Sequence, residues 1–387
     1  MPHQPRVHRK IITKFQELDY RNSSLFHPVA ARPTFREGLT LWLLVLCGHL
    51  LLWAAVLWKD GANWSSLLQH WDAGWYLRIV TQGYDEASAA FLPLFPYTIK
   101  GLSQLFQVSR PEYILWLGSG FSLLCFLLSL WLLFSAKSMK RNELIGYGAI
   151  LMFVLSPSSF IFHSFHTEAF FLLLSVLAFI FLQKDQWITA AVWAGLAAMV
   201  RHQGVFLAIG IAFGAALQVP GWQRKMSRFL AIGLISGLIW SLTPLLHLME
   251  GRGAFPALSA HQSHWYIADS MSSYFKTFLL ANPIQNYRVG SFIHQAFYFI
   301  LLFGLGLLIR KGRWAEAMYC FLSLAIMPLQ GELIDAFRFG AVLFPLLFVL
   351  GEKWQETPRW FAWPSLAAYV ALNMVVTWQY AISRWAY

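Results

Sequence analysis

The chain has 387 residues, of which 58% are hydrophobic and only 12% are charged, and its mean hydropathy is +0.52. Ordinary soluble domains carry about twice that share of charged residues, so the composition excludes a soluble protein and indicates a polytopic membrane protein. The formal net charge of +11 would favour nucleic-acid binding in a soluble protein. In a membrane protein it is explained by basic loops on one side of the bilayer, and we expect no nucleic-acid partner.

The N-terminal 38 residues are polar and basic, and the first apolar run lacks a small-residue cleavage site of the secretory type. We therefore expect residues 1–38 to form a cytoplasmic tail and residues 39–387 a single integral membrane domain, because the remaining loops are too short for a separate soluble enzyme. The three cysteines lie inside apolar runs without CxxC spacing, so we expect them to be core residues.

Apolar runs follow one another along the chain, which predicts an all-α membrane protein with about eleven transmembrane helices. The predicted spans are residues 39–58, 113–134, 144–162, 167–183, 187–200, 204–219, 228–249, 291–309, 314–330, 338–351 and 360–380. Several are shorter than the roughly 20 residues that a bilayer requires. Short helices with polar ends are better suited to the wall of a cavity than to a lipid-facing shell.

The lysine and arginine residues predict the orientation in the membrane. With the N-terminus in the cytoplasm, most of the 29 basic residues lie on the cytoplasmic side, in clusters at short loops such as 137–141 and 310–313. The predicted first extracytoplasmic loop, about residues 59–112, and the segments around Glu168, Arg201 and 331–338 then share the opposite face. Polar side chains are therefore expected to converge on the extracytoplasmic side.

The first loop contains a carboxylate, Asp72, between Trp71 and Trp75. Tryptophan favours the membrane–water boundary, and a carboxylate placed there is costly to desolvate. The spacing of apolar residues predicts a short amphipathic helix that Gly83 ends. Asp72 is then either a catalytic carboxylate or a solvated cap at the start of that helix.

A second interfacial element is predicted from the proline-broken run 91–96, continuing as a helix to Phe106. Between the third and fourth spans, His163, His166 and Glu168 lie close together. They are interpreted as a hydrogen-bonding cluster for a sugar or a phosphate, or as polar residues that complete a helix junction. A zinc site is a weaker alternative, because the spacing is not that of a zinc signature.

Two arginines lie at the ends of predicted spans. Arg201, followed by His202, either binds a phosphate through parallel hydrogen bonds, extends to the membrane surface, or pairs with Glu168. Arg338 either pairs with Asp335, three residues earlier, or is a second phosphate ligand. The long 250–290 loop is interpreted either as a lid over an acceptor site or as a packed loop. No P-loop, nucleophile elbow or dinucleotide motif is present.

Several motifs resemble the PIG-V-type mannosyltransferases of the GT-C class. They are Trp71-Asp72-Ala73, Gly83-Tyr84, Phe91 to Pro96, Ser156-Pro157, Thr167-Glu168-Ala169, Ala194 to Ala197 with Arg201 and Gly204, and Arg338 with Phe344-Pro345-Leu346. The resemblance runs through most of the chain in the same order. It differs at Arg201-His202-Gln203, where the family often has Ser-Asn after the arginine. It implies a GT-C fold and inverting transfer of mannose from a polyprenyl-phosphate or dolichyl-phosphate carrier, with Asp72 as catalytic base.

In the mechanism that follows, the arginines stabilise the leaving phosphate. Glu168, His163 and His166 hold sugar hydroxyls or orient the acceptor, and Trp71, Trp75 and residues 91–96 line a lateral groove for the lipid. No metal or other cofactor is expected, and the partners are membrane lipids, the lipid-linked sugar donor and a lipid or glycan acceptor. Because the chain is compact, we expect a bacterial member in the plasma membrane rather than one in the endoplasmic reticulum. Transfer of another group on the same scaffold, a transporter or flippase of lipid-linked sugars, and a purely structural membrane protein are the alternatives.

Overall fold

A computed structural model describes residues 34–85, 87–134, 146–250, 289–330, 333 and 335–383, and every regular element in these ranges is a helix. Five helical segments are long and apolar enough to cross a membrane. They are α2 (Phe35–Asp60), α6 (Pro111–Phe134), α11 (Trp222–Trp240) continued by α12 (Leu242–Met249), α15 (Val289–Arg310) and α19 (Arg359–Ala381). The predicted all-α, multi-pass membrane architecture is confirmed.

Four further apolar helices are shorter, as the sequence predicts. They are α8 (Glu168–Gln183), α9 (Trp187–Ala198), α10 (Gln203–Leu217) and α16 (Trp314–Ile326), the last followed by the 3-10 turn η3 (Met327–Gln330). Their length, 12 to 16 residues, is below the roughly 20 that span a bilayer alone.

Among the eleven predicted spans, the third and the tenth are interrupted near a proline. The third contains α7 (Tyr147–Val154), then a turn that includes Pro157, then the 3-10 helix η2 (Ser159–His163). The tenth is divided into α17 (Ala336–Val342) and α18 (Phe344–Gln355), and Pro345 lies in the first turn of α18. Proline has no N–H to donate to the preceding turn, so it is tolerated at the start of a helix but not in its interior.

Local sequence explains the ends of the first helices. Thr34 and Glu37 form a reciprocal capping box at the start of α2, and Gly61, in the left-handed region with φ of 64°, ends it. The predicted amphipathic helix is α4 (Asp72–Gln82), which ends at Gly83 with φ of 87°. It buries Tyr76, Leu77, Ile79 and Val80 and leaves Arg78 and Gln82 exposed.

The first loop forms a helical layer between α2 and α6. Besides α4 it contains α3 (Trp64–Leu68), the turn η1 (Ala87–Ala90) and α5 (Leu94–Leu105), so the predicted second element is also present. α3, α4 and α5 all pack on α6. The backbone N–H of Leu94 donates to the carbonyl of Met199 at 3.1 Å, which ties α5 to the turn between α9 and α10.

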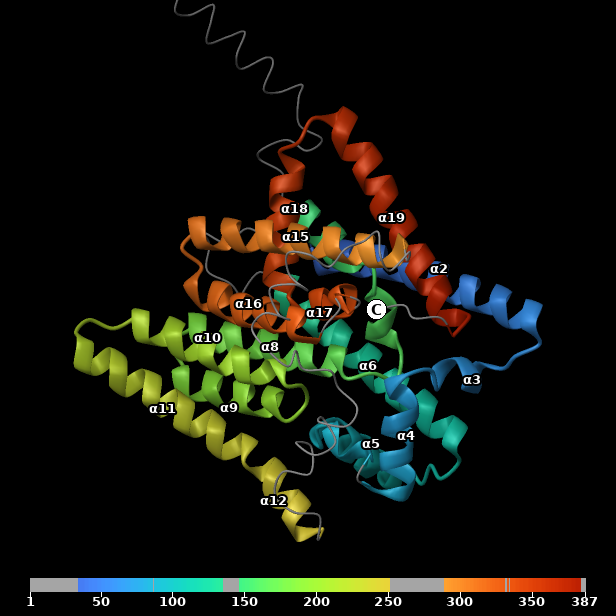
Figure 1. Ribbon diagram of the computed structural model, residues 1–387, viewed down its shortest axis with the longest axis horizontal. Helices are drawn as coiled ribbons and strands as arrows, with labels where there is room; N and C mark the ends of the chain where they lie inside the picture. Colours follow the sequence, from blue (N-terminus) through green and yellow to red (C-terminus); the bar gives the residue numbers. More distant parts are fainter. Residues whose placement is uncertain are drawn as a thin grey trace, which may run out of the picture.

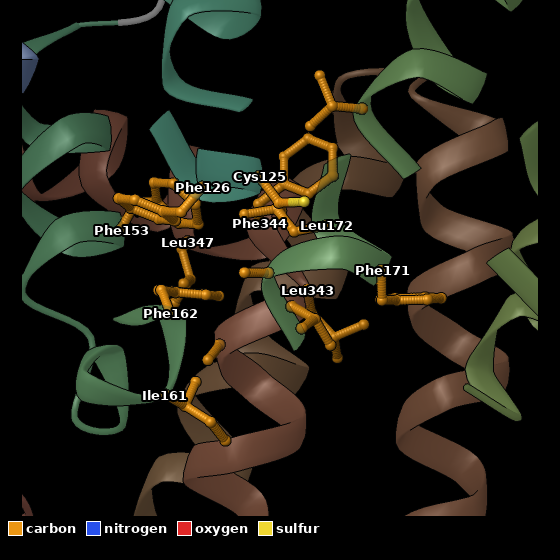
Figure 2. Packing of buried hydrophobic residues seen from close by; sticks show 14 of the residues in the cluster. Cys125, Phe126, Phe153, Ile161, Phe162, Phe171, Leu172, Leu343, Phe344 and Leu347 are labelled. Carbon is orange, nitrogen blue, oxygen red and sulfur yellow. The ribbon is translucent and has the colours of Figure 1, made fainter. Parts of the chain in front are cut away.

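The remaining helices surround α8 and α17, which lie near the centre of the molecule (Figure 1). α9 packs against α8, α10 and α11, and α10 packs on α16; on the other side, α2 packs on α19 and α7 on α18. A buried core joins α6, α7, η2 and α18 and includes Phe126, Phe153, Phe162, Phe344 and Leu347 (Figure 2). The core holds the central turns around residues 156–168 in place from one side.

Candidate active site

Asp72 is the first residue of α4, and it follows a residue in a rare backbone conformation. Trp71 has φ of 56°, a region that residues other than glycine seldom occupy. Such strain is maintained only where the surrounding structure fixes it, and it is common at functional sites. The interpretation of Asp72 as a helix cap is not the one observed, because Trp71 occupies the cap position of α4. Oδ2 of Asp72 instead accepts a hydrogen bond from Arg338.

Glu168 begins α8 and is completely buried. A carboxylate is favoured at this end of a helix, where the backbone N–H groups point outward. A single oxygen, Oε1, accepts hydrogen bonds from the guanidinium groups of both Arg201 and Arg338, with 2.5 Å to Nε of Arg338. Glu168 is therefore the residue that joins the two arginines.

Arg201 lies in the tight turn between α9 and α10. Its Nε donates to the side-chain oxygen of Gln203 at 3.0 Å, and its Nη1 donates to Thr167 Oγ1 at 3.0 Å and to Glu168. The guanidinium also lies over the ring of Phe339, 5.7 Å from its centre. Of the interpretations left open by the sequence, the pair with Glu168 is the one observed, and it leaves Nη2 available.

The turn that carries Arg201 requires glycine at position 204. A Cβ atom there would lie 2.2 Å from the backbone nitrogen of Ala198 and 2.3 Å from the carbonyl carbon of Ala197. These atoms belong to the end of α9 and cannot move without opening the turn. The close approach of α9 and the start of α10 therefore fixes where the Arg201 backbone lies.

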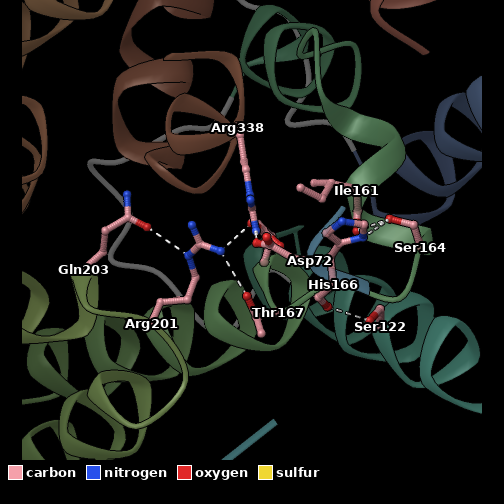
Figure 3. A network of polar contacts seen from close by, with 10 residues as sticks. Asp72, Ser122, Ile161, Ser164, His166, Thr167, Arg201, Gln203 and Arg338 are labelled. Atoms are coloured by element: carbon pink, nitrogen blue, oxygen red, sulfur yellow. Dashed lines mark hydrogen bonds and ion pairs between the residues drawn. The ribbon is translucent and has the colours of Figure 1, made fainter. Parts of the chain in front are cut away.

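Four segments far apart in the sequence thus meet in one network (Figure 3). Asp72 comes from α4, Glu168 from α8, Arg201 from the α9–α10 turn and Arg338 from α17. Two carboxylates balance two guanidinium groups, so the network is neutral as a whole. A neutral, hydrogen-bonded arrangement is the form in which charges are tolerated in a buried position.

Oε2 of Glu168 is buried without a hydrogen bond from the described residues. Two further polar atoms of the network also have no hydrogen-bond partner there, and both are accessible. They are Oδ1 of Asp72 and Nη2 of Arg201. The Asp72 side chain is 20% exposed, whereas Glu168 is fully enclosed. The network therefore presents one carboxylate oxygen and one guanidinium nitrogen to a ligand.

A third carboxylate lies beside the network. Asp335 precedes α17, and its Oδ1 is buried without a hydrogen bond from the part of the chain that the structure describes. Burial raises the pKa of Asp335 to about 6, although the charge of nearby Arg338 acts in the opposite direction. Arg338 was one of the predicted phosphate ligands. In this structure it forms ion pairs with the carboxylates of Asp72 and Glu168.

The other predicted site residues are divided between this network and the surrounding packing. His166 lies beside Asp72 in Figure 3; its Nδ1 contacts the Ser164 hydroxyl at 2.9 Å, and its carbonyl accepts from Ser122. His163 points away from Asp72 into a group of aromatic rings. The centre of its ring lies 5.3 Å from that of His49 and 5.1 Å from that of Trp53. The structure thus separates the two histidines that the sequence places three residues apart.

The predicted tryptophans lie on either side of Asp72. Trp71 is half-buried against the core, and Trp75 stacks on Phe91 with 5.8 Å between ring centres. His202 is exposed at the start of α10. The tail 1–33, most of the 250–290 loop and Glu332 lie outside the described residues. In the described ranges no group of three or more histidine, cysteine, aspartate or glutamate side chains is arranged to hold a metal ion.

Two residues that accept hydrogen bonds from Arg201 were not predicted as site residues from the sequence. Thr167 and Gln203 each hold one side of the Arg201 guanidinium. Both stand next to residues that were selected, so a search for hydrogen-bond acceptors beside a buried arginine would have found them.

Comparison with protein families identifies the family of the chain. Residues 56–247, about half of the chain, match the family described as Mannosyltransferase (PIG-V), and this range includes Asp72, Glu168 and Arg201 but not Arg338. Comparison with curated proteins and with solved structures gives no match. The chain belongs to the PIG-V-like mannosyltransferase family and is a membrane-embedded glycosyltransferase with a GT-C-like, all-helical fold.

Proposed function

We propose that the protein transfers mannose from a polyprenyl-phosphate carrier to a hydroxyl group of a lipid or glycan acceptor, with inversion at the anomeric carbon. The reaction takes place on the extracytoplasmic face of the membrane in this proposal. The observation that supports it is the network itself, in which an accessible carboxylate oxygen lies beside two guanidinium groups.

Asp72 is the general base in this proposal. Oδ2 is held by Arg338, which fixes the orientation of the carboxylate, and Oδ1 remains available for the acceptor hydroxyl. Glu168 is unsuited to the role because it is enclosed and accepts from both arginines. A base that is positioned within hydrogen-bond distance of the nucleophile typically contributes about 10²–10⁴ to the rate.

The reaction is a single displacement. The acceptor hydroxyl gives its proton to Oδ1 of Asp72 while its oxygen attacks the anomeric carbon of mannose. The bond from that carbon to the phosphate oxygen breaks, and the phosphate leaves with the electron pair. Attack and departure on opposite faces of the sugar invert the configuration, as in inverting enzymes that act on glycosides.

Arg201 stabilises the leaving group. A guanidinium donates well-oriented hydrogen bonds to phosphate oxygens, and the free Nη2 is the donor available for this. Thr167, Gln203 and Glu168 hold the other nitrogens, so little reorganisation is needed when negative charge develops. A phosphate is a good leaving group without prior protonation, so no general acid and no metal ion are needed in this scheme.

The test uses purified protein in detergent with polyprenyl-phosphate-mannose and a lipid extract as the source of acceptor. Release of polyprenyl phosphate is measured for wild type and for Asp72→Asn. We expect release by wild type and at least a 100-fold loss in Asp72→Asn, because the amide keeps the shape but cannot accept the proton.

Asp85→Asn is the matched control. Asp85 is also a carboxylate of the first loop paired with an arginine, Arg78, but it lies outside the network and is partly exposed. Its variant should keep wild-type release. Equal release by Asp72→Asn and wild type would exclude Asp72 as the base, provided that both melt at the same temperature.

A further inference from the structure

The site contains two hydrogen-bonding side chains that the proposed reaction does not use. They are Tyr76 of α4 and Asp335, which precedes α17. Tyr76 follows Asp72 by four positions and Asp335 precedes Arg338 by three, and these spacings put each pair on one side of its helix. Because Asp72 and Arg338 are joined by an ion pair, Tyr76 and Asp335 flank that pair from two different helices.

The ring of Tyr76 is enclosed, whereas its hydroxyl is not used by the fold. The residue is 5% exposed, and its ring meets those of Phe91 and Phe95 edge-on, each with 5.2 Å between ring centres. Within the described ranges the hydroxyl has no hydrogen-bond partner, and it is not fully enclosed. Burial raises the pKa of Tyr76 and the charge of Asp72 acts in the same direction, so the hydroxyl stays protonated and can both donate and accept.

Asp335 is a carboxylate without a partner. Neither of its oxygens forms a hydrogen bond or an ion pair in the part of the chain that the structure describes, and Oδ1 is buried. The charges of Arg338 and Asp72 both act on this carboxylate, which agrees with a position beside their ion pair. A buried carboxylate without donors is costly, so the fold itself gives no reason for Asp335.

The chemistry of these two groups favours a neutral ligand that carries several hydroxyl groups. A carboxylate accepts hydrogen bonds from hydroxyls but repels a phosphate, and the guanidinium groups of the network disfavour a cation. In the proposed displacement the sugar lies between Oδ1 of Asp72, which binds the attacking hydroxyl, and Nη2 of Arg201, which binds the phosphate (Figure 3). The sugar would therefore lie beside the ion pair that Tyr76 and Asp335 flank.

We propose that Tyr76 and Asp335 form the subsite that binds the hydroxyl groups of the mannosyl unit of the donor. The inference rests on the proposed function, which assigned no residue to the sugar. The sequence-based expectation gave this role to Glu168, His163 and His166, of which Glu168 is enclosed and His163 points away into aromatic rings.

The first experiment measures binding and needs no turnover. The Kd of the full-length protein in detergent is measured for polyprenyl-phosphate-mannose and for polyprenyl methyl phosphate, a diester of the same charge without the sugar. The ratio of the two Kd values isolates the contribution of the sugar. We expect a ratio of about 10 or more in wild type and a ratio about fivefold lower in Tyr76→Phe and in Asp335→Asn, with the Kd of the methyl diester unchanged within about twofold.

Neither substitution removes a contact of the fold, so both variants should fold, and a lower ratio then reports the ligand. Tyr113→Phe and Asp85→Asn are the matched controls. Tyr113 is an exposed tyrosine at the start of α6, and Asp85 pairs with Arg78 outside the network. Both control variants should keep the wild-type ratio.

The second experiment identifies the hydroxyl groups that are bound. The Kd of wild type and of each variant is measured for donors in which the 2-, 3-, 4- or 6-hydroxyl of mannose is replaced by hydrogen. The loss caused by Tyr76→Phe should fall below about twofold for one of these donors, because its hydrogen bond is already absent, and the loss caused by Asp335→Asn should fall for another. An equal loss for all four donors in both variants would overturn the proposal.

The outcomes separate this inference from the proposed function. Turnover by wild type, with an unchanged Kd ratio in either variant, would overturn the subsite and leave the transferase reaction in place. A ratio that falls as expected, without turnover of polyprenyl-phosphate-mannose by wild type, would support the subsite and count against the proposed reaction. Equal weakening of both diesters in Tyr76→Phe would assign its hydroxyl to the phosphate and overturn the proposal.

Discussion

Replacement of Glu168 by glutamine tests whether the network depends on one buried charge. The side chain is fully enclosed, and its Oε1 accepts from both Arg201 and Arg338. Glutamine keeps the shape and one acceptor oxygen but leaves the network with one uncompensated positive charge. Breaking a buried ion pair in this way lowers the free energy of unfolding by about 3–5 kcal/mol. We expect a loss at the lower end of this range, because Arg338 still forms its ion pair with Asp72.

A double-mutant cycle isolates the charge interaction. Arg201→Gln alone leaves Glu168 with one partner, whereas Glu168→Gln/Arg201→Gln leaves a neutral network in which Asp72 still pairs with Arg338. We therefore expect the double variant to lose about 2 kcal/mol less than the sum of the single losses, within the range found for residues in contact.

The assay is the free energy of unfolding in mixed micelles, followed by tryptophan fluorescence. The Lys353–Glu356 pair, which is exposed on α18, is the control, and Glu356→Gln should change stability by less than about 0.5 kcal/mol. Additive losses in the Glu168–Arg201 cycle, within about 0.5 kcal/mol, would refute the view that these charges act as one unit.

Three further predictions concern single residues. Gly204→Ala should destabilise the protein by about 1–3 kcal/mol because its Cβ meets backbone 2.2 Å away, whereas Gly306→Ala, which meets nothing, should not; melting curves of both variants are the measurement. Gln203→Leu should raise KM for the lipid donor about tenfold with little change in kcat, because Nε of Arg201 loses a partner at 3.0 Å; unchanged KM would count against a role for Gln203 in positioning Arg201. Because burial raises the pKa of Asp335 to about 6, the folded protein binds this proton more tightly than the unfolded chain, and the resulting stability is present below about pH 4 and lost as the pH rises through 6. Asp335→Asn should abolish that loss, on the order of 2 kcal/mol, in melting temperatures recorded from pH 4 to 8, and parallel profiles would contradict the assignment.

The class of protein and most helices could be predicted from the sequence, because hydropathy and helical periodicity are properties of neighbouring residues. The amphipathic helix α4 and its end at Gly83 follow from spacing alone. The same holds for the prolines, in retrospect: Pro157 and Pro345 mark where the third and tenth predicted spans are interrupted. The sequence also indicated that Asp72 is a candidate site residue, because a carboxylate between two interfacial tryptophans is costly to desolvate.

The site itself was decided only by the tertiary structure. Asp72 and Arg338 are 266 positions apart, and Glu168 and Arg338 are 170 apart, so no local pattern indicates that they meet. The sequence allowed Arg338 to pair with Asp335, a neighbour on the same helix face, but the ion pairs formed are with Asp72 and Glu168.

The histidines show that closeness in sequence does not predict closeness of side chains either. His163 and His166 were grouped because they are close in sequence, yet the turn between η2 and α8 directs one toward Asp72 and the other into the rings around Trp53. Sequence distance constrains where a backbone can go, whereas the direction of a side chain depends on which surfaces are buried when the helices pack. The sequence by itself therefore determined a helical membrane protein with an acidic motif between two tryptophans. Packing decided which charges surround that motif, because ion pairs form through space and not along the chain.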